Sequence, residues 1–485
     1  MDFSNIAGRL LTGGTSVRAL TIGARLLYYD ALRKLLLRMI YNRIQARLNK
    51  KEAIFNRPNK VEQQRKLMYL AILHTVDRVI KRRLVSQPVA RKVAMLWSRA
   101  LWLPPEKRSA VQCFRENYGL NPPWFITISP GHACNLKCQG CYANSGRSDV
   151  KLEWSILDRI ITEAKQLWGI RLVVFSGGEP LIYHSAGKDI LDIVERNPDL
   201  LFLMFTNGTL VNKETATRLA RLGNLTPAFS VEGMRKRTDD CRGTGVFDSV
   251  LNAIDRVREV GVPFGISVSV TRANYDEVLS DEFLDFFFDK FGAFYGFFFQ
   301  YIPIGRKPDF RWVPTPAQRI RFWRRVWEIV EERKLFIVDF WNHGPLVKGC
   351  IAAGREGGYI YIDWNGKVMP CVFAPYSAGN IEEVYKHGGT LNDLWATPFF
   401  RAIRKWQCDY GYSQKELSVE ANWLTPCPFR DHYTLFRRWI DRYQPEPEDE
   451  SAQEALLDKE YYKCLVKYGS ELKEITQEIW KKEYL

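Results

Sequence analysis

From Phe125 onward, short apolar segments alternate with segments of helical spacing, and no other feature of this 485-residue sequence constrains its fold as strongly. The apolar segments are residues 125–129, 171–178, 201–208, 227–233, 264–271 and 295–305. Between them, segments such as 152–168 and 248–262 repeat their apolar residues at helical spacing. Strands that alternate with helices build a parallel sheet, so six such units predict a partial barrel of the α/β class.

The carboxyl ends of the strands are where a barrel of this kind carries its chemistry. The residues that follow the apolar segments are a cysteine-rich loop and the segments 176–180, 206–208, 230–233 and 267–272. We therefore expect a partial (β/α)6 TIM-like barrel whose functional site lies at that edge of the sheet.

The repeat of strands and helices stops after residue 305. Residues 333–341 and 359–371 look like strands, and Asn365-Gly366 is a strong hairpin-turn signal. We expect this region to form a smaller α+β domain, followed by a polar linker. The predicted divisions are a basic helical region at 1–110, a barrel at 120–310, the α+β domain at 335–440 and a helical tail at 451–485.

Composition excludes several classes of protein. Charged residues at 26% and aromatic residues at 13% are not those of a mostly disordered chain. We find no run of about 18 apolar residues that would span a membrane, and no apolar core of an export signal at the N-terminus. A cytoplasmic protein is expected, and its ten cysteines are then metal or redox ligands rather than disulfides.

Three of these cysteines, Cys134, Cys138 and Cys141, lie within eight residues in the loop after the first apolar segment. Thiolates at this spacing can bind three irons of a [4Fe–4S] cluster and leave the fourth iron without a protein ligand. Structural zinc is the alternative, but it normally takes a fourth Cys or His at ligand spacing, and His132 forms no such pattern.

The CxxxCxxC loop after the first strand, followed by Ser176-Gly-Gly-Glu-Pro180 after the second, resembles the radical S-adenosylmethionine (SAM) superfamily. The resemblance implies that the three cysteines hold the cluster and that SAM chelates its open iron. It also implies that a one-electron reductant, such as ferredoxin or flavodoxin, feeds the cluster. The residues implied to bind the methionine amino group are Gly177, Gly178, Glu179 and Pro180, because glycines admit close backbone approach and a carboxylate suits an ammonium.

One position departs from the family pattern. Many members carry an aromatic residue directly before the third cysteine, near the adenine, whereas this sequence has Gly140 there and Tyr142 after the cysteine. By analogy with the family, the later strand ends complete the SAM pocket, although each also suits ordinary turn chemistry. The residues expected to contribute are Asn207, Ser230, Glu232 and Ser269.

A second set of cysteines begins with Cys350 and Cys371, with Gly366 five positions before the latter. This spacing around a hairpin resembles the SPASM/twitch extension of radical SAM enzymes, although its dense later cysteine run is missing. The resemblance favours one auxiliary cluster held by Cys350, Cys371, Cys408 and Cys427, with Cys408 in a segment that carries no motif. A three-thiolate cluster, a metal-free hairpin and a zinc site are the alternatives.

Cys241 lies just beyond the fourth apolar segment, where it could face the barrel mouth and return a hydrogen atom to a product radical. A buried free cysteine with no such role is the simpler interpretation, as it is for Cys113 and Cys464.

The net charge of +15 is concentrated in residues 1–110, which hold 23 basic and 6 acidic residues. The rest of the chain has 47 basic and 49 acidic residues. Three interpretations compete for this region: an arm on an anionic membrane surface, a nucleic-acid contact, or a helical domain packed on the barrel. We see no nucleic-acid-binding motif, so nucleic acid is not expected as a partner.

A membrane arm would place the enzyme on the inner face of the membrane, acting on acyl chains or other molecules with unactivated C–H bonds. The first alternative is a peptide or protein maturase, which the auxiliary-cluster resemblance favours. A non-enzymatic iron–sulfur scaffold for electron transfer is the second, and the intact Gly177–Pro180 segment argues against it.

Overall fold

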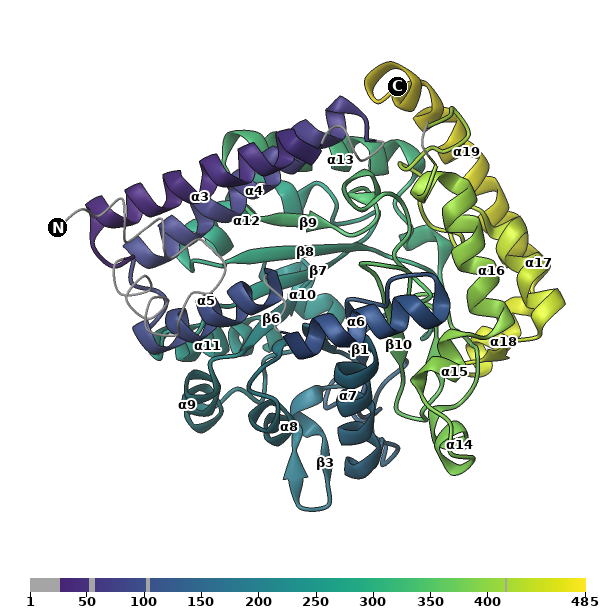
Figure 1. Ribbon diagram of the computed structural model, residues 1–485, viewed down its shortest axis with the longest axis horizontal. Helices are drawn as coiled ribbons and strands as arrows, with labels where there is room; N and C mark the ends of the chain where they lie inside the picture. The colour runs from purple at the N-terminus through teal and green to yellow at the C-terminus, as the bar shows by residue number, and fades with distance from the viewer. Residues whose placement is uncertain (1–26, 52–56, 102–104, 415–416) are drawn as a thin grey trace.

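The structure is a computed structural model that describes residues 27–51, 57–101, 105–414 and 417–485 (Figure 1). One large sheet runs through the molecule, and helices cover its outer side. Residues 1–26, which hold the first part of the proposed membrane arm, lie outside the described residues.

The sheet has nine strands in the order β11-β10-β1-β2-β5-β6-β7-β8-β9. The strands are β1 (Phe125–Ile128), β2 (Leu172–Phe175), β5 (Leu201–Thr206), β6 (Leu225–Val231), β7 (Gly265–Val270), β8 (Tyr295–Gln300), β9 (Ile337–Asp339), β10 (Tyr359–Ile362) and β11 (Val368–Met369). Every neighbouring pair is parallel except β10 with β11. The six strands predicted from the apolar segments are β1, β2 and β5 to β8, which confirms the expected α/β barrel.

Helices between the strands pack their apolar faces on the sheet. In α7 (Trp154–Trp168), buried side chains such as Leu157, Ile161 and Trp168 repeat at helical spacing, and Gly169 ends the helix in a left-handed conformation. The other elements along the barrel are β3 (His184–Ser185), β4 (Lys188–Asp189), α8 (Ile190–Arg196), α9 (Lys213–Leu222), α10 (Arg235–Arg242), α11 (Val246–Glu259), α12 (Asp281–Leu284) and α13 (Pro316–Glu332). The 3-10 or π turns are η1 (Pro180–Ile182), η2 (Glu277–Leu279), η3 (Asp285–Lys290), η4 (Phe310–Trp312) and η5 (Gly344–Val347).

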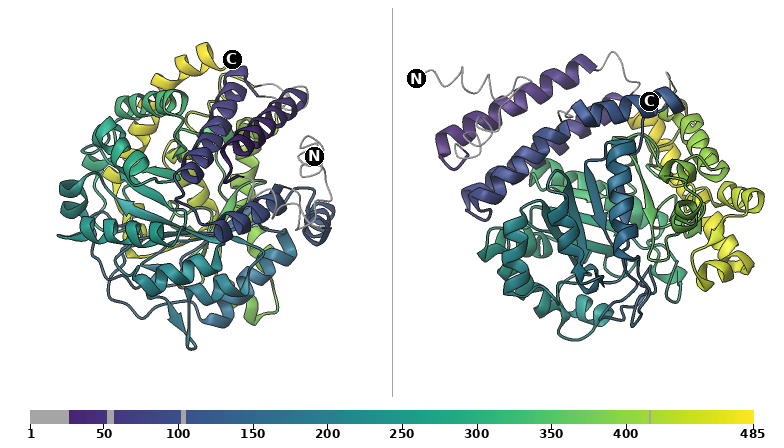
Figure 2. Two further views of the ribbon diagram at one scale, coloured as in Figure 1. Left: turned by 90° about the vertical axis from the view of Figure 1, so that its left-hand side faces the viewer. Right: turned by 60° about the horizontal axis from the view of Figure 1, so that its bottom comes forward.

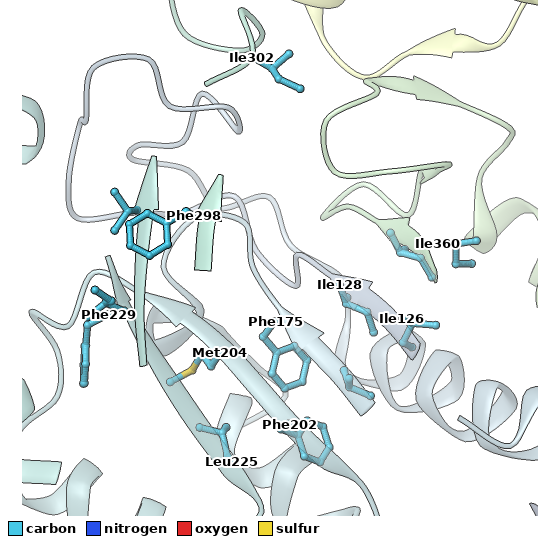
Figure 3. Packing of buried hydrophobic residues seen from close by; sticks show 14 of the residues in the cluster. Ile126, Ile128, Phe175, Phe202, Met204, Leu225, Phe229, Phe298, Ile302 and Ile360 are labelled. Atoms are coloured by element: carbon cyan, nitrogen blue, oxygen red, sulfur yellow. The ribbon is translucent and has the colours of Figure 1, made fainter. Parts of the chain in front are cut away.

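The core between the sheet and these helices is built from neighbouring strands. Figure 3 shows Ile126 and Ile128 of β1 beside Phe175 of β2, with Ile360 of β10 on the other side. All four side chains are fully buried. The strand ends are therefore held in place by a continuous apolar core.

The hairpin of β10 and β11 extends the main sheet. The sequence predicts it in a separate α+β domain, but Phe125 of β1 pairs with Tyr359 of β10 in parallel register. Without this partner, β1 would present a bare edge of unpaired backbone groups. The cysteines of the hairpin are thereby brought to the open side of the barrel.

Helices follow the hairpin and close the right-hand side of the molecule in Figure 1. They are α14 (Ile381–Lys386), α15 (Leu391–Trp395), α16 (Pro398–Gln407), α17 (Tyr433–Tyr443), α18 (Glu450–Leu457) and α19 (Lys459–Glu483). The π turn η6 (Cys408–Tyr412) continues α16, and the short strands β12 (Tyr376–Ser377) and β13 (Glu446–Pro447) pair with each other.

In its described residues, the basic region forms the helices α3 (Asp30–Lys51), α4 (Asn59–Lys81), α5 (Gln87–Leu101) and α6 (Pro105–Tyr118). In both views of Figure 2, α3 and α4 lie along the outside of the barrel. Val61 and Ala71 of α4 are fully buried, and Gln64 donates a hydrogen bond to the Tyr484 hydroxyl over 2.9 Å. Helix α4 is therefore an integral part of the fold, whereas Lys34 and Arg38 of α3 are exposed. Within the described ranges, no helix is both long and apolar enough to cross a membrane.

Candidate active site

A cavity of about 580 Å³ lies inside the barrel and reaches from the loop after β1 to the hairpin of β10 and β11. Seven cysteines line it, and six of them lie in two groups. The first group is Cys134, Cys138 and Cys141, and the second is Cys350, Cys371 and Cys427. The structure thus brings two predicted ligand sets to one cavity although more than 200 residues separate them in the sequence.

The first group lies on a loop that is hydrogen-bonded to a residue from the far end of the barrel. Arg306, just after β8, donates to the carbonyl oxygens of Cys138, over 2.7 Å, and Ser145. Its own backbone N–H donates to the Cys141 carbonyl over 2.9 Å. Burial raises the pKa of Cys134 to about 11, and burial also raises the pKa of Cys138. Burial therefore disfavours the free thiolate at these residues, and an electropositive partner would stabilise it.

The segment Ser176–Pro180, here called the glycine turn, packs directly on the cysteine loop. A Cβ atom on Gly178 would lie 2.1 Å from the carbonyl oxygen of Ala133, so only glycine fits there. Gly177 has a φ of +106°, and a Cβ atom on it would lie 2.6 Å from that of Ser129. Close approach of two backbones therefore requires glycine at 178, whereas the positive φ and the Ser129 side chain require it at 177.

Gly177 and Gly178 line the cavity, but Glu179 and Pro180 do not. The Glu179 carboxylate is 2% exposed, and it accepts hydrogen bonds from the Thr206 hydroxyl and the Asn207 backbone N–H, both over 2.8 Å. Burial raises its pKa, and these donors act against that shift. In this structure the carboxylate fixes the end of β5 next to the cavity.

The residues predicted to complete the SAM pocket, Asn207, Ser230, Glu232 and Ser269, all line the cavity. Glu232 also forms a buried ion pair with Arg242, whose Nε donates to the carboxylate over 3.0 Å. The other carboxylate oxygen of Glu232 accepts the Ser269 N–H over 3.1 Å.

Arg242 was not among the residues predicted from the sequence. It lines the cavity, and its guanidinium lies 4.0 Å from the Cys138 sulfur. A cation beside the first cysteine group can receive the carboxylate of an amino-acid ligand. Its place after the Glu232 turn, at the end of a short helix, gives no local sequence signal for this role.

The departure at Gly140 has a steric cause. Gly140 has a φ of +63°, and a Cβ atom there would lie 2.6 Å from the Trp312 ring and 3.0 Å from the Tyr301 ring. Both rings line the cavity, with centroids 5.5 Å apart. Aromatic side chains from the end of the barrel thus occupy the space that a bulky residue before the third cysteine would need.

The second cysteine group lies on the hairpin side. Backbone N–H groups point at each sulfur: Ala352 donates to Cys350 over 3.4 Å, Phe373 to Cys371 over 3.5 Å and Arg430 to Cys427 over 3.4 Å. The Tyr359 hydroxyl lies 3.0 Å from the Cys371 sulfur. Burial raises the pKa of both Cys371 and Cys427 to about 12.

Cys408 is not among the residues that line the cavity. It begins the π turn after α16, and the Arg355 guanidinium lies within electrostatic range of both Cys350 and Cys408. Cys241 does line the cavity, and its thiol donates to the Gln139 carbonyl over 3.6 Å.

Between the two cysteine groups the cavity wall is aromatic. Tyr142, next to Cys141, and Phe373, two residues after Cys371, approach each other with ring centroids 6.1 Å apart. Phe299 and Trp341 contact Phe373 at 5.8 and 4.9 Å. The charged residues that line the cavity, Glu232 and Arg242, lie at the first cysteine group. The wall on the hairpin side therefore suits an apolar, uncharged group.

Both cysteine groups fit iron–sulfur clusters by their chemistry. Each presents three half-buried thiols on one cavity, and backbone N–H groups point at the sulfurs of Cys134, Cys350, Cys371 and Cys427. Within the described part of the chain, no three His, Cys, Asp or Glu side chains converge closely enough to hold one metal ion. A cluster differs from a single ion because it takes one thiolate at each of several irons.

Comparison with family models finds two matches. Residues 128–283 match the model described as the radical SAM superfamily, and residues 350–417 match that of SPASM, an iron–sulfur cluster-binding domain.

Curated proteins of known activity are similar over the same region. The AdoMet-dependent heme synthase of Methanosarcina barkeri is 28% identical over 316 residues, which are 59% of this chain and 85% of that protein. The mycofactocin maturase MftC of Mycobacterium ulcerans is 28% identical over 301 residues, 59% of this chain and 79% of that protein. The sporulation killing factor maturation protein SkfB of Bacillus subtilis is 29% identical over 160 residues, 32% of this chain and 38% of that protein.

Solved structures share the fold. Native anSMEcpe with bound AdoMet and a Cp18Cys peptide superposes with a TM-score of 0.51 at 17% identity, over 74% of this chain and all of that one. Streptococcus suis SuiB bound to the precursor peptide SuiA has a TM-score of 0.50 at 20% identity, over 61% of this chain and 70% of that one.

Proposed function

We propose that this chain, which is a radical SAM enzyme with a SPASM domain, abstracts a hydrogen atom from an apolar C–H bond of a substrate held in its aromatic cavity. Its cofactors are SAM, a [4Fe–4S] cluster and auxiliary iron–sulfur chemistry in the SPASM domain. Because the chain is an enzyme of this superfamily, the hypothesis of a non-enzymatic scaffold for electron transfer is wrong. A one-electron reductant is common to such enzymes, and we propose ferredoxin or flavodoxin.

Cys134, Cys138 and Cys141 would hold the [4Fe–4S] cluster, and Cys350, Cys371 and Cys427 the auxiliary one. When bound, the first cluster and SAM supply a 5′-deoxyadenosyl radical, which removes a hydrogen atom that polar side chains cannot remove.

The chain's own residues orient the amino-acid end of SAM. The backbone of Gly177 and Gly178 lies against the cysteine loop, where it is open to the cavity. Arg242 offers a cation for the SAM carboxylate beside Cys138, and Glu232 holds that cation in place. Cys241 lines the same part of the cavity, so it stays a candidate to return a hydrogen atom to a product radical.

The observation that carries the proposal is the aromatic wall between the two cysteine groups. Phe299, Trp341 and Phe373 present apolar surface to the space between the cluster sites. An exposed primary alkyl radical would react with any nearby C–H bond, so a dry, close-fitting wall is needed to select one. Acyl or isoprenoid groups fit this wall.

A peptide substrate is the second candidate. MftC and SkfB are named as maturation proteins, and both solved structures of the same fold contain a peptide. An apolar side chain of a precursor peptide could occupy the same aromatic cavity.

Both candidates are tested by anaerobic incubation of the reconstituted full chain with SAM and dithionite. Organic extracts and peptide fractions from deuterated cells of the source organism are added separately, and 5′-deoxyadenosine is measured by mass spectrometry. We expect the active fraction to transfer deuterium into 5′-deoxyadenosine. The variant C134A/C138A/C141A is the control, and a wild-type yield no greater than its yield would refute the proposal.

The membrane arm is tested separately. Exposed Lys34 and Arg38 on α3 would each contribute about 1 kcal/mol at an anionic surface. Charge reversal of both should reduce co-sedimentation with phosphatidylserine vesicles, whereas reversal of exposed Lys481 and Lys482 on α19 should not. Equal sedimentation of the two variants would remove the membrane from the proposal.

A further inference from the structure

Tyr359 connects the edge of the barrel to the second cysteine group. It lies on β10, is 3% exposed, and its ring stacks on Phe125 of β1 with centroids 4.8 Å apart and planes at 15°. Backbone pairing of Phe125 with Tyr359 fixes the register of the two strands. The position of the phenol is thus set by the sheet itself.

The hydroxyl of this fixed ring lies 3.0 Å from the Cys371 sulfur. Cys371 already receives the Phe373 backbone N–H over 3.5 Å. A sulfur that binds iron is a thiolate, which has no proton to donate, so in the cluster-bound protein the phenol is the donor.

We propose that Tyr359 is a positioning residue that raises the reduction potential of the auxiliary cluster through a hydrogen bond to the Cys371 thiolate. Hydrogen bonds to the sulfurs are among the factors that set cluster potentials. Reduction adds negative charge to the cluster and its ligands, so a donor stabilises the reduced form more than the oxidised form. The inference rests on the ligand role proposed for Cys371.

The same strand provides a matched control. Tyr361 lies two residues further along β10, on the same face of the strand, and is fully buried. Its hydroxyl donates to Ser129 over 2.8 Å and contacts no cysteine in any hydrogen bond described for it. Removing either hydroxyl therefore deletes one hydrogen bond from the same strand. Only the Tyr359 hydroxyl contacts a proposed cluster ligand.

The test is a redox titration of the reconstituted full-length protein, followed by electron paramagnetic resonance. The auxiliary signal is the part of the spectrum that C350A/C371A lacks. We expect Tyr359→Phe to reduce the equilibrium constant for one-electron reduction about tenfold, which corresponds to about 59 mV toward more negative potential. Tyr361→Phe should titrate as wild type does.

A second substitution at position 359 distinguishes loss of the hydrogen bond from a folding defect in Tyr359→Phe. Incorporation of 3,5-difluorotyrosine at position 359 alone gives a more acidic donor and should shift the potential in the opposite direction. Wild-type potentials in both altered proteins, or equal shifts in Tyr359→Phe and Tyr361→Phe, would overturn the inference. Failure of the ligand assignment is recognised separately, because C350A/C371A would then retain its full iron content.

Discussion

The backbone N–H of Gly177 donates a hydrogen bond to the Tyr142 hydroxyl over 2.9 Å, which joins the residue after the third cysteine to the first glycine of the glycine turn. The same hydroxyl lies 2.6 Å from the Ser176 Oγ. Burial raises the pKa of Tyr142 to about 12, so the phenol stays neutral. The loop proposed to hold the cluster and the turn proposed to hold SAM thus share one hydroxyl.

Tyr142→Phe should therefore weaken SAM binding while the cluster still assembles. Loss of the hydrogen bond from the Gly177 N–H alone, at about 0.5–1.5 kcal/mol, corresponds to about a 2- to 12-fold rise in the dissociation constant. Titration of SAM, followed by the change in the cluster's paramagnetic resonance spectrum, measures it. Unaltered affinity would mean that the turn keeps its position without Tyr142.

Gly178→Ala should prevent proper assembly of the first cluster site. Its Cβ would lie 2.1 Å from the Ala133 carbonyl oxygen, so the backbone must move, at a cost of about 1–3 kcal/mol. Iron and acid-labile sulfide per chain, together with the melting temperature, report the effect. Gly146 lies in the cysteine loop after β1, and a Cβ atom there has nothing within 4 Å, so Gly146→Ala should match wild type. Equal iron content in the two variants would contradict the steric argument.

The position of Cys408 decides between a three-thiolate and a four-thiolate auxiliary site. Because Cys408 does not line the cavity, we expect Cys408→Ala to keep its iron. Replacing Cys350 and Cys371 should remove the iron of about one cluster and leave the first cluster spectrally intact. Iron loss in Cys408→Ala equal to that in the double variant would restore Cys408 as a ligand.

Patterns that are local in the sequence predicted the fold well, and they also singled out the first cysteine group. Six strands follow from apolar segments, and the cysteine loop and glycine turn each lie within a few residues. The partners of these motifs come from far along the chain. Arg306 binds the carbonyl of Cys138 across 168 positions, and Trp312 fills the space beside Gly140.

The pairing of β10 with β1 is likewise a long-range contact, between Tyr359 and Phe125. Such contacts leave no periodicity in the sequence, so the hairpin could be recognised but not placed in the main sheet. Arg242 could not be predicted for the same reason. Its proposed role depends on long-range contacts that bring it next to Cys138 and Glu232.

Asp363 should make stability depend on pH near neutrality. It is fully buried in the turn of the β10–β11 hairpin, and one carboxyl oxygen accepts the N–H groups of Asn365 and Lys367 over 2.9 and 2.8 Å. Burial raises its pKa to about 7, and burial together with Asp363 raises the pKa of Glu448. In the unfolded chain the pKa of an aspartate is about 3.9.

The folded protein therefore holds a proton at Asp363 that the unfolded chain has lost between about pH 4 and pH 7. Stability should fall as the pH rises through this window, on the order of 4 kcal/mol in total. Asp363→Asn should flatten the melting temperature between pH 5 and pH 8, whereas Asp441→Asn, which is largely exposed, should not. A wild-type slope in Asp363→Asn would assign the dependence to other groups.

Variants of Arg242 and Glu232 should affect stability and SAM affinity differently. Arg242→Met leaves the Glu232 carboxylate buried without its cation, and loss of one partner from a buried pair costs about 3–5 kcal/mol. Adding Glu232→Gln removes the stranded charge and keeps an acceptor for the Ser269 N–H, so the double variant should unfold in urea within about 1 kcal/mol of wild type. SAM affinity should stay low in both, because the cation beside Cys138 is gone. Recovery of SAM binding in the double variant would show that Arg242 only balances Glu232.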